Sequence, residues 1–101
     1  MKYYIKTNES TKELDDKMGI MISIHIINKI IKDHNNYCLL ETIYNNINKY
    51  AKKEQIILYK NDKYRNLNTY IKKNNKSILN FIKKFNIYSI ENNVVFIKNL
   101  I

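Results

Sequence analysis

Apolar residues recur every three or four positions over residues 12–33, which is the spacing of a helix with one buried side. The residues that align on that side are Ile20, Ile24, Ile27 and Ile31. Isoleucines also alternate with period two between residues 20 and 26, so a strand is the rival interpretation. The length of the segment favours the helix, and Ser10 with Glu13 has the spacing of a capping box near its start.

Shorter patterns flank this segment. Residues 1–7 alternate weakly between polar and apolar positions and predict a short edge strand. Asn35 and Asn36 indicate a break before a second helix over residues 37–53. The inward positions of that helix are Leu40, Ile43, Ile47 and Tyr50. Residues 54–59 then suggest a short strand or an extended connection.

Two shorter helices are predicted further along the chain. The first spans residues 63–74 and turns Leu67, Tyr70 and Ile71 inward. A tight break at Asn74 and Asn75 separates it from the second, over residues 76–85. The apolar stripe of this last helix has the spacing i, i+3, i+4, i+7 and consists of Ile78, Phe81, Ile82 and Phe85.

A β-hairpin is predicted at the C-terminal end, with a two-residue turn at Asn92 and Asn93, since asparagine tolerates positive φ. In this register Tyr88 faces Ile97 and Ile90 faces Val95, which makes one side of the hairpin wholly apolar. A slip of one residue would scatter that set between the two sides.

These elements predict an α+β fold that is mostly helical. Helix, short turn, helix and hairpin is the order of a winged helix, so we expect a winged-helix-like bundle of three to four helices with a C-terminal β-hairpin. Residues 37–101 would form this winged-helix-like domain, and residues 1–36 would form an N-terminal extension of strand and helix.

The C-terminal two-thirds of the chain resembles winged-helix modules of the LOTUS (OST-HTH) type. The likeness lies in the segments LLETIYNNINKYAKK, KYRNLNTYIKK and SILNFIKKFNIYSIENNVVFI, with an L-x-F-I pattern at residues 79–82 and strands patterned F-x-I and V-x-I. The glycines usual in the loops of that family are absent here. The resemblance implies RNA binding or docking onto an RNA helicase, and it implies no enzymatic activity.

The net charge of +9 suggests a nucleic acid or another acidic partner. The chain contains 19 Ile, 17 Lys and 17 Asn, a composition that resembles proteins of AT-rich viruses or other AT-rich genetic elements, and codon bias alone raises lysine content. The position of the charge is more informative than its total. Residues 1–50 hold 7 basic and 6 acidic side chains, whereas residues 51–101 hold 11 basic and 3 acidic ones.

A nucleic-acid-binding surface is therefore predicted opposite the apolar stripes of the last two helices. Its residues are Arg65, Lys72, Lys73, Lys76, Ser77, Asn80, Lys83 and Lys84. The cations would neutralise phosphates and release counterions, and the serine and asparagine would hydrogen-bond base edges or sugars. The alternative is an ordinary solvated face. Tyr59, Tyr64 and Tyr70 lie among these cations and suit either base stacking or a half-buried core position.

No catalytic pattern accompanies this surface, so we expect a protein that is not an enzyme and has no cofactor. Gly19 is the single glycine, which excludes a glycine-rich phosphate loop, and the spacing of His25, His34 and Cys38 does not suit a metal site. The lone cysteine fits a reducing compartment. No apolar run reaches the length of a bilayer span and no signal peptide is evident, so we expect an intracellular protein, cytoplasmic or nuclear, without a membrane partner.

Two hypotheses of function remain. The first is a small winged-helix protein that binds nucleic acid, RNA or DNA, without catalysis. The second is a structural or adaptor subunit of a larger assembly, with a protein partner or a second copy of the chain. Its docking surface would be the isoleucine-rich N-terminal helix, because so broad an apolar set exceeds what a small core covers. The residues expected in that interface are Ile20, Ile24, Ile27 and Ile31.

Overall fold

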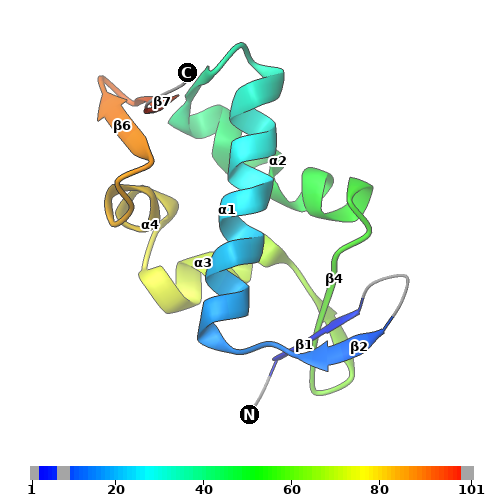
Figure 1. Cartoon of the computed structure of the whole chain (residues 1–101). Helices are drawn as coiled ribbons and strands as arrows, with labels where there is room; N and C mark the ends of the chain where they lie inside the picture. Colours follow the sequence, from blue (N-terminus) through cyan, green and yellow to red (C-terminus); the bar gives the residue numbers. More distant parts are fainter. Residues whose placement is uncertain (1–2, 7–9, 99–101) are drawn as a thin grey trace.

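The computed structural model describes residues 3–6 and 10–98, and these form an α+β fold with four helices and two small antiparallel sheets. About half of the chain is helical. The helices are α1 (Asp16–Asp33), α2 (Leu40–Lys53), α3 (Leu67–Asn75) and α4 (Ile78–Lys83). The two sheets lie near opposite ends of α1, which runs through the middle of the molecule (Figure 1).

The first helix is confirmed, and the rival strand interpretation is wrong. It begins at Asp16, because residues 11–13 pair as a strand. The Asp15 carboxylate caps it by accepting a hydrogen bond of 2.7 Å from the Met18 backbone N–H, so the capping box at Ser10 and Glu13 is wrong. The expected break follows the helix at Asn35 and Asn36, which both have positive φ. Within the described ranges, no helix has the length and apolar character of a bilayer span.

The N-terminal sheet has the strand order β2-β1-β4-β5. Its strands are β1 (Tyr3–Lys6), β2 (Thr11–Glu13), β4 (Ile57–Lys60) and β5 (Lys63–Arg65). The predicted strands at residues 1–7 and 54–59 are thus confirmed by β1 and β4, but β1 lies inside the sheet instead of at its edge. Residues 1, 2 and 7 of the predicted segment lie outside the described residues. A two-residue turn at Asn61 and Asp62 joins β4 to β5.

The C-terminal sheet has the order β3-β7-β6 and contains the predicted hairpin. Its strands are β3 (Tyr37–Leu39), β6 (Tyr88–Glu91) and β7 (Val94–Ile97). The hairpin register is confirmed pair for pair, and the turn residues Asn92 and Asn93 have φ of 50° and 64°. The strand β3 was not expected, and it takes the first three residues of the helix predicted over residues 37–53.

The two basic helices α3 and α4 are shorter than expected. Residues 63–65 belong to β5, so α3 begins at Leu67, after Asn66. The break falls at Lys76, whose φ of 63° ends α3, just beyond the predicted asparagine pair. The Ser77 hydroxyl oxygen then caps α4 by accepting a hydrogen bond of 3.1 Å from the Asn80 backbone N–H.

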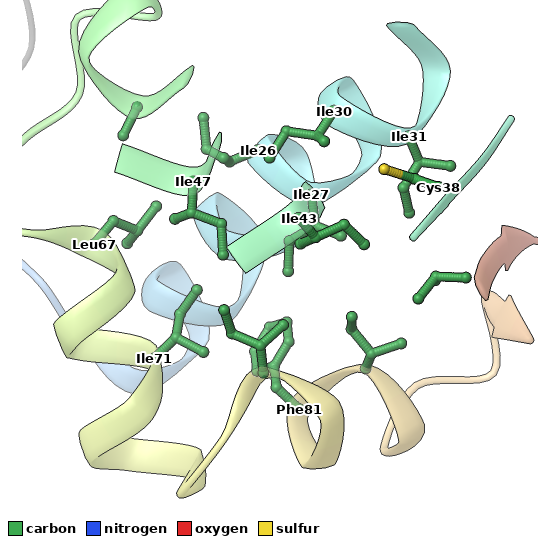
Figure 2. Packing of buried hydrophobic residues seen from close by; sticks show 14 of the residues in the cluster. Ile26, Ile27, Ile30, Ile31, Cys38, Ile43, Ile47, Leu67, Ile71 and Phe81 are labelled. Atoms are coloured by element: carbon green, nitrogen blue, oxygen red, sulfur yellow. The ribbon is translucent and has the colours of Figure 1, made fainter. Parts of the chain in front are cut away.

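One hydrophobic core joins all four helices and the C-terminal sheet (Figure 2). Isoleucines of α1 and α2 meet Ile71 of α3 and Phe81 of α4 in its centre. Val95 of β7 belongs to the same core. The predicted inward stripe of α4 is confirmed, since Ile78, Phe81 and Ile82 are buried. The helix α1, expected as part of an extension, therefore supplies much of the core on which the rest of the chain packs.

Gly19 lets α1 approach α3 closely. A Cβ atom at this position would lie 2.0 Å from the Tyr70 hydroxyl oxygen and 2.8 Å from the ring carbon that carries it. Tyr70 is itself buried, and its ring meets Tyr3 of β1 edge to face, with 5.1 Å between the centroids. The contact between Gly19 and Tyr70 thus links α1, α3 and the N-terminal sheet.

Candidate nucleic-acid interface

The predicted binding residues lie in three parts of the chain that follow one another. Arg65 lies at the end of β5, and Lys72 and Lys73 lie on α3. The remaining residues follow in the α3–α4 connection, on α4 and at its C-cap, Lys84. Six of them are exposed, namely Lys72, Lys73, Lys76, Asn80, Lys83 and Lys84, and Arg65 and Ser77 are half-buried. The structure brings Arg65 and Lys73 together, and it directs Lys72 and Lys84 toward other neighbours.

A basic cluster forms where the β4–β5 hairpin meets α3. We use this name for Lys60, Lys63, Arg65 and Lys73. Lys60 and Lys63 are direct cross-strand partners, a position in which like charges repel. Residues two apart on a strand share a face, so Arg65 lies on the same side of the sheet as Lys63. The Nε atom of Arg65 is buried and has no hydrogen-bond partner among the described residues.

The electrostatics of Lys60 show how close these cations are. The Lys73 side chain lies within hydrogen-bonding reach and lowers the pKa of Lys60, and loss of hydration and the charge of Arg65 act in the same direction. The Lys60 Nζ atom also lies 4.8 Å from the centroid of the Tyr3 ring, a cation–π distance. The charged groups that act on Lys60 are thus themselves cations, and a bound anion would relieve their repulsion.

Sequence reasoning missed Lys60 and Lys63 as members of this site. It assigned residues 63–74 to one helix, which hides the alternation of Lys63 and Arg65 along a strand. The signal that identifies them is the Asn61–Asp62 pair between two polar-apolar alternations, because this pair suits a two-residue hairpin turn.

The other predicted cations have separate surroundings. Lys72 extends over α2, with its Nζ atom 5.7 Å from the centroid of the Tyr44 ring. Lys84 and Asp16 line the same hollow, of about 230 Å³, between α4 and the start of α1. Asn80 and Lys83 are exposed on α4. Ser77 was expected to contact nucleic acid, and its oxygen instead accepts the capping hydrogen bond of α4.

The three tyrosines that suited base stacking divide between core and surface. Tyr70 is buried in the core. Tyr59 and Tyr64 are direct partners across β4 and β5, and Tyr59 is also the direct partner of Tyr4 on β1. We call Tyr4, Tyr59 and Tyr64 the tyrosine row. Its members share the face of the N-terminal sheet that is turned away from the buried residues Ile5 and Leu58.

The proposed isoleucine docking surface is wrong for two of its four residues. Ile27 and Ile31 are 0% exposed, because they form the centre of the core, and Ile20 and Ile24 are half-buried. The large apolar side chain of α1 that is exposed is Met21, at 62%. It lines a hollow of about 470 Å³ with Met18, Ile22 and His25.

The described residues contain no group of three His, Cys, Asp or Glu side chains with the geometry of a metal site. Cys38 is buried in the core, and burial raises the pKa of its thiol, although a side-chain hydrogen bond with Thr42 acts in the opposite direction. A thiol with a raised pKa is a poor nucleophile.

No family model, no curated protein and no solved structure matches the chain.

Proposed function

We propose that this chain is a small winged-helix protein that binds nucleic acid without catalysis and without a cofactor. The observation that carries the proposal is the basic cluster. Four cationic side chains converge there from two strands and a helix, close enough for Lys73 to lower the pKa of Lys60. Phosphate groups would neutralise this repulsion and release their own counterions, which is the main source of affinity in nucleic-acid binding.

The element order supports the winged-helix part of the proposal. The strand β3 follows α1 and precedes α2, and it pairs with β7 of the C-terminal hairpin. Only Lys76 and Ser77 separate α3 from α4, and the hairpin is the next element after α4. This is the arrangement of two helices and a wing, with a strand between the first helices that extends the wing. In such a fold α4 is the reading helix, and Asn80 and Lys83 are the exposed side chains it offers.

Charge reversal within the basic cluster tests the proposal. The variant Lys63→Glu/Lys73→Glu changes two exposed cluster residues, and Lys49→Glu/Lys98→Glu makes the same change in net charge at two exposed positions elsewhere. Binding of a labelled 20-nucleotide single strand and a 20-base-pair duplex is measured by fluorescence anisotropy over a series of salt concentrations. Loss of two phosphate contacts should lower the slope of log K against log salt by about 1.4 to 1.8 in magnitude.

The control variant should keep a slope close to that of the original protein. If the original protein binds neither ligand at low salt, the proposal is wrong. If both double variants weaken binding equally, net charge alone acts and the basic cluster is not the site.

A second candidate function is a structural or adaptor subunit of a larger assembly. The observation that favours it is the exposed Met21, with Met18 and Ile22 in the hollow beside it. Sedimentation of the protein over a range of concentrations tests self-association, and Met21→Lys should abolish any increase in mass. A constant monomer mass would leave only assemblies with a different protein.

A further inference from the structure

The tyrosine row is a continuous feature that the fold does not need for its core. Tyr4, Tyr59 and Tyr64 are paired in register across three neighbouring strands. Neighbouring strands are about 4.8 Å apart, so the row extends over about 10 Å of the sheet. Tyr4 is 43% exposed and Tyr64 is 52% exposed, and Tyr59 between them is partly exposed. Three aromatic rings therefore reach solvent side by side, on strands whose opposite face holds the buried Ile5 and Leu58.

Polar groups surround one end of this row. Tyr4 and Tyr59 line a hollow of about 630 Å³ together with Lys6, Thr11 and the turn residues Asn61 and Asp62. An ammonium, a hydroxyl, an amide and a carboxylate are thus available beside two aromatic rings. This combination suits a flat ring with hydrogen-bonding edges that is attached to an anionic backbone.

The net charge of the strands increases across the N-terminal sheet from β2 to β5. Its strands carry five basic residues and one acidic residue, and the acidic one, Glu13, faces Tyr4 from β2. The basic cluster lies at the β5 edge of this sheet but on its other face, because Lys63 and Arg65 alternate with Tyr64 and Arg65 is the direct partner of Leu58. Since β5 is an edge strand, a chain of phosphates along that edge would meet these cations from the side, with its bases directed over the row toward β1.

We propose that the tyrosine row is a base-stacking platform for single-stranded nucleic acid, RNA or DNA, whose phosphates lie along the β5 edge beside the basic cluster. The proposal rests on the proposed function and specifies its ligand. Exposed aromatic side chains on a four-stranded antiparallel sheet are a recurring way to bind unpaired bases, because every base offers a flat face. A duplex keeps its bases stacked inside and cannot use such a platform.

A tryptophan reporter tests the contact directly. The chain has no Trp, so Tyr64→Trp introduces a single indole into the row. Tyr37→Trp is the matched control, since Tyr37 is 56% exposed but lies in the C-terminal sheet. Titration with a ten-residue oligothymidine should quench the indole fluorescence of Tyr64→Trp and leave that of Tyr37→Trp unchanged. Equal quenching in both variants, or none in either, would contradict stacking on the row.

Affinity provides a second, independent measurement. Tyr64→Ala should weaken binding of the single strand by about 5-fold to 100-fold, the range measured when one stacking residue is lost. Tyr64→Phe should bind like the original protein, because it keeps the ring, and Tyr37→Ala is the control for loss of an exposed tyrosine. Affinity for the duplex should change in none of these variants, and circular dichroism checks that each one is folded.

The outcomes separate this inference from the proposed function. If Lys63→Glu/Lys73→Glu weakens binding while Tyr64→Ala does not, nucleic-acid binding stands and the stacking platform is wrong. If neither strand type binds the original protein, both proposals are wrong. If an acidic peptide, but no nucleic acid, quenches Tyr64→Trp, the row is a peptide-binding surface and the inference is also overturned.

Discussion

The two sheets are built alike at their turns and differently on their faces. Each contains a hairpin closed by two residues at positive φ, Asn61 and Asp62 in one sheet and Asn92 and Asn93 in the other. The strands of the N-terminal sheet carry five basic residues and one acidic residue, whereas those of the C-terminal sheet carry no basic residue and one acidic residue, Glu91. The same turn chemistry thus supports one strongly basic sheet and one nearly uncharged sheet.

The tyrosines of the two hairpins also differ, although Tyr37 on β3 of the C-terminal sheet is exposed as well. Tyr88 in the C-terminal sheet is buried, and its hydroxyl donates a hydrogen bond of 2.8 Å to the Asn28 side-chain oxygen on α1. Tyr59 and Tyr64 in the N-terminal sheet turn toward solvent. The C-terminal hairpin, expected as a wing, thus packs its tyrosine against α1, and we propose that the surface for a polyanion lies on the N-terminal sheet and on α3.

The largest expected effect on stability comes from removing one tyrosine ring in each sheet. Tyr88→Ala should lower the free energy of unfolding by about 4 kcal/mol, because it leaves a cavity and an unpaired Asn28. Tyr64→Ala should lower it by less than about 1 kcal/mol, since its ring is half-exposed. Urea denaturation measures both values. Similar losses in the two variants would show that the two tyrosines do not differ in burial as described.

The next effect tests how the N-terminal sheet is held on the helices. Gly19→Ala should destabilise the protein by about 2 kcal/mol, because the added methyl group overlaps the Tyr70 hydroxyl and displaces a ring that contacts Tyr3. The higher helix propensity of alanine offsets about 1 kcal/mol of the clash itself. Thermal denaturation measures the change. Tyr70→Phe should partly restore stability in the double variant, and a more stable Gly19→Ala protein would contradict the close approach.

High pH should destabilise the protein through the buried tyrosine of the C-terminal sheet. Burial raises the pKa of Tyr88 above the ordinary tyrosine value of 10.0. Above pH 10 the unfolded chain loses this proton and the folded chain keeps it, so stability is complete below pH 10 and falls as the pH rises further. The loss is about 1.4 kcal/mol for each pH unit and each such group. Burial also raises the pKa of Tyr70, which adds to the slope.

Melting temperatures between pH 9 and pH 11.5 measure this dependence. Tyr88→Phe should flatten the decline, because phenylalanine does not titrate. A decline as steep in Tyr88→Phe as in the original protein would contradict the buried tyrosine of the C-terminal sheet as its source.

The smallest effects should be equal in the two sheets. Asp62→Gly and Asn93→Gly each place glycine at the second turn residue, where φ is 59° and 64°. Glycine adopts this conformation without a steric cost, so each variant should gain about 0.5 kcal/mol of stability. Differential scanning calorimetry measures both gains. A gain in one hairpin and a loss in the other would show that the turns are not equivalent.

Much of the fold could be predicted from local patterns, but the pairing of strands that are distant in the sequence could not. The register of the C-terminal hairpin follows from Asn92, Asn93 and the alternation beside them, all within ten residues. The pairing of β1 with β4 joins Ile5 to Leu58, and nothing in either segment specifies the other. The strand β3 is three residues long and precedes a helix with a strong apolar stripe, so the stripe was extended over it.

The residues of the candidate site were likewise predicted where they depend on local patterns and missed where they depend on strand pairing. Arg65 and Lys73 were predicted from their place opposite an apolar stripe, and they do lie in the basic cluster. Lys60 and Lys63 were missed, because their positions depend on a hairpin whose second strand was assigned to a helix. Tyr4 could not be placed beside Tyr59 and Tyr64 without the pairing of β1 with β4.

The single glycine of the chain has a consequence for how this sequence tolerates change. The described turns use asparagine, aspartate, glutamine or lysine at positive φ, and Gly19 sits within a helix, where Tyr70 fills the space of a side chain. In a complete survey of single substitutions, the turn positions should accept several residue types. Gly19 should accept almost none, and it should behave as a core position although it has no side chain to bury.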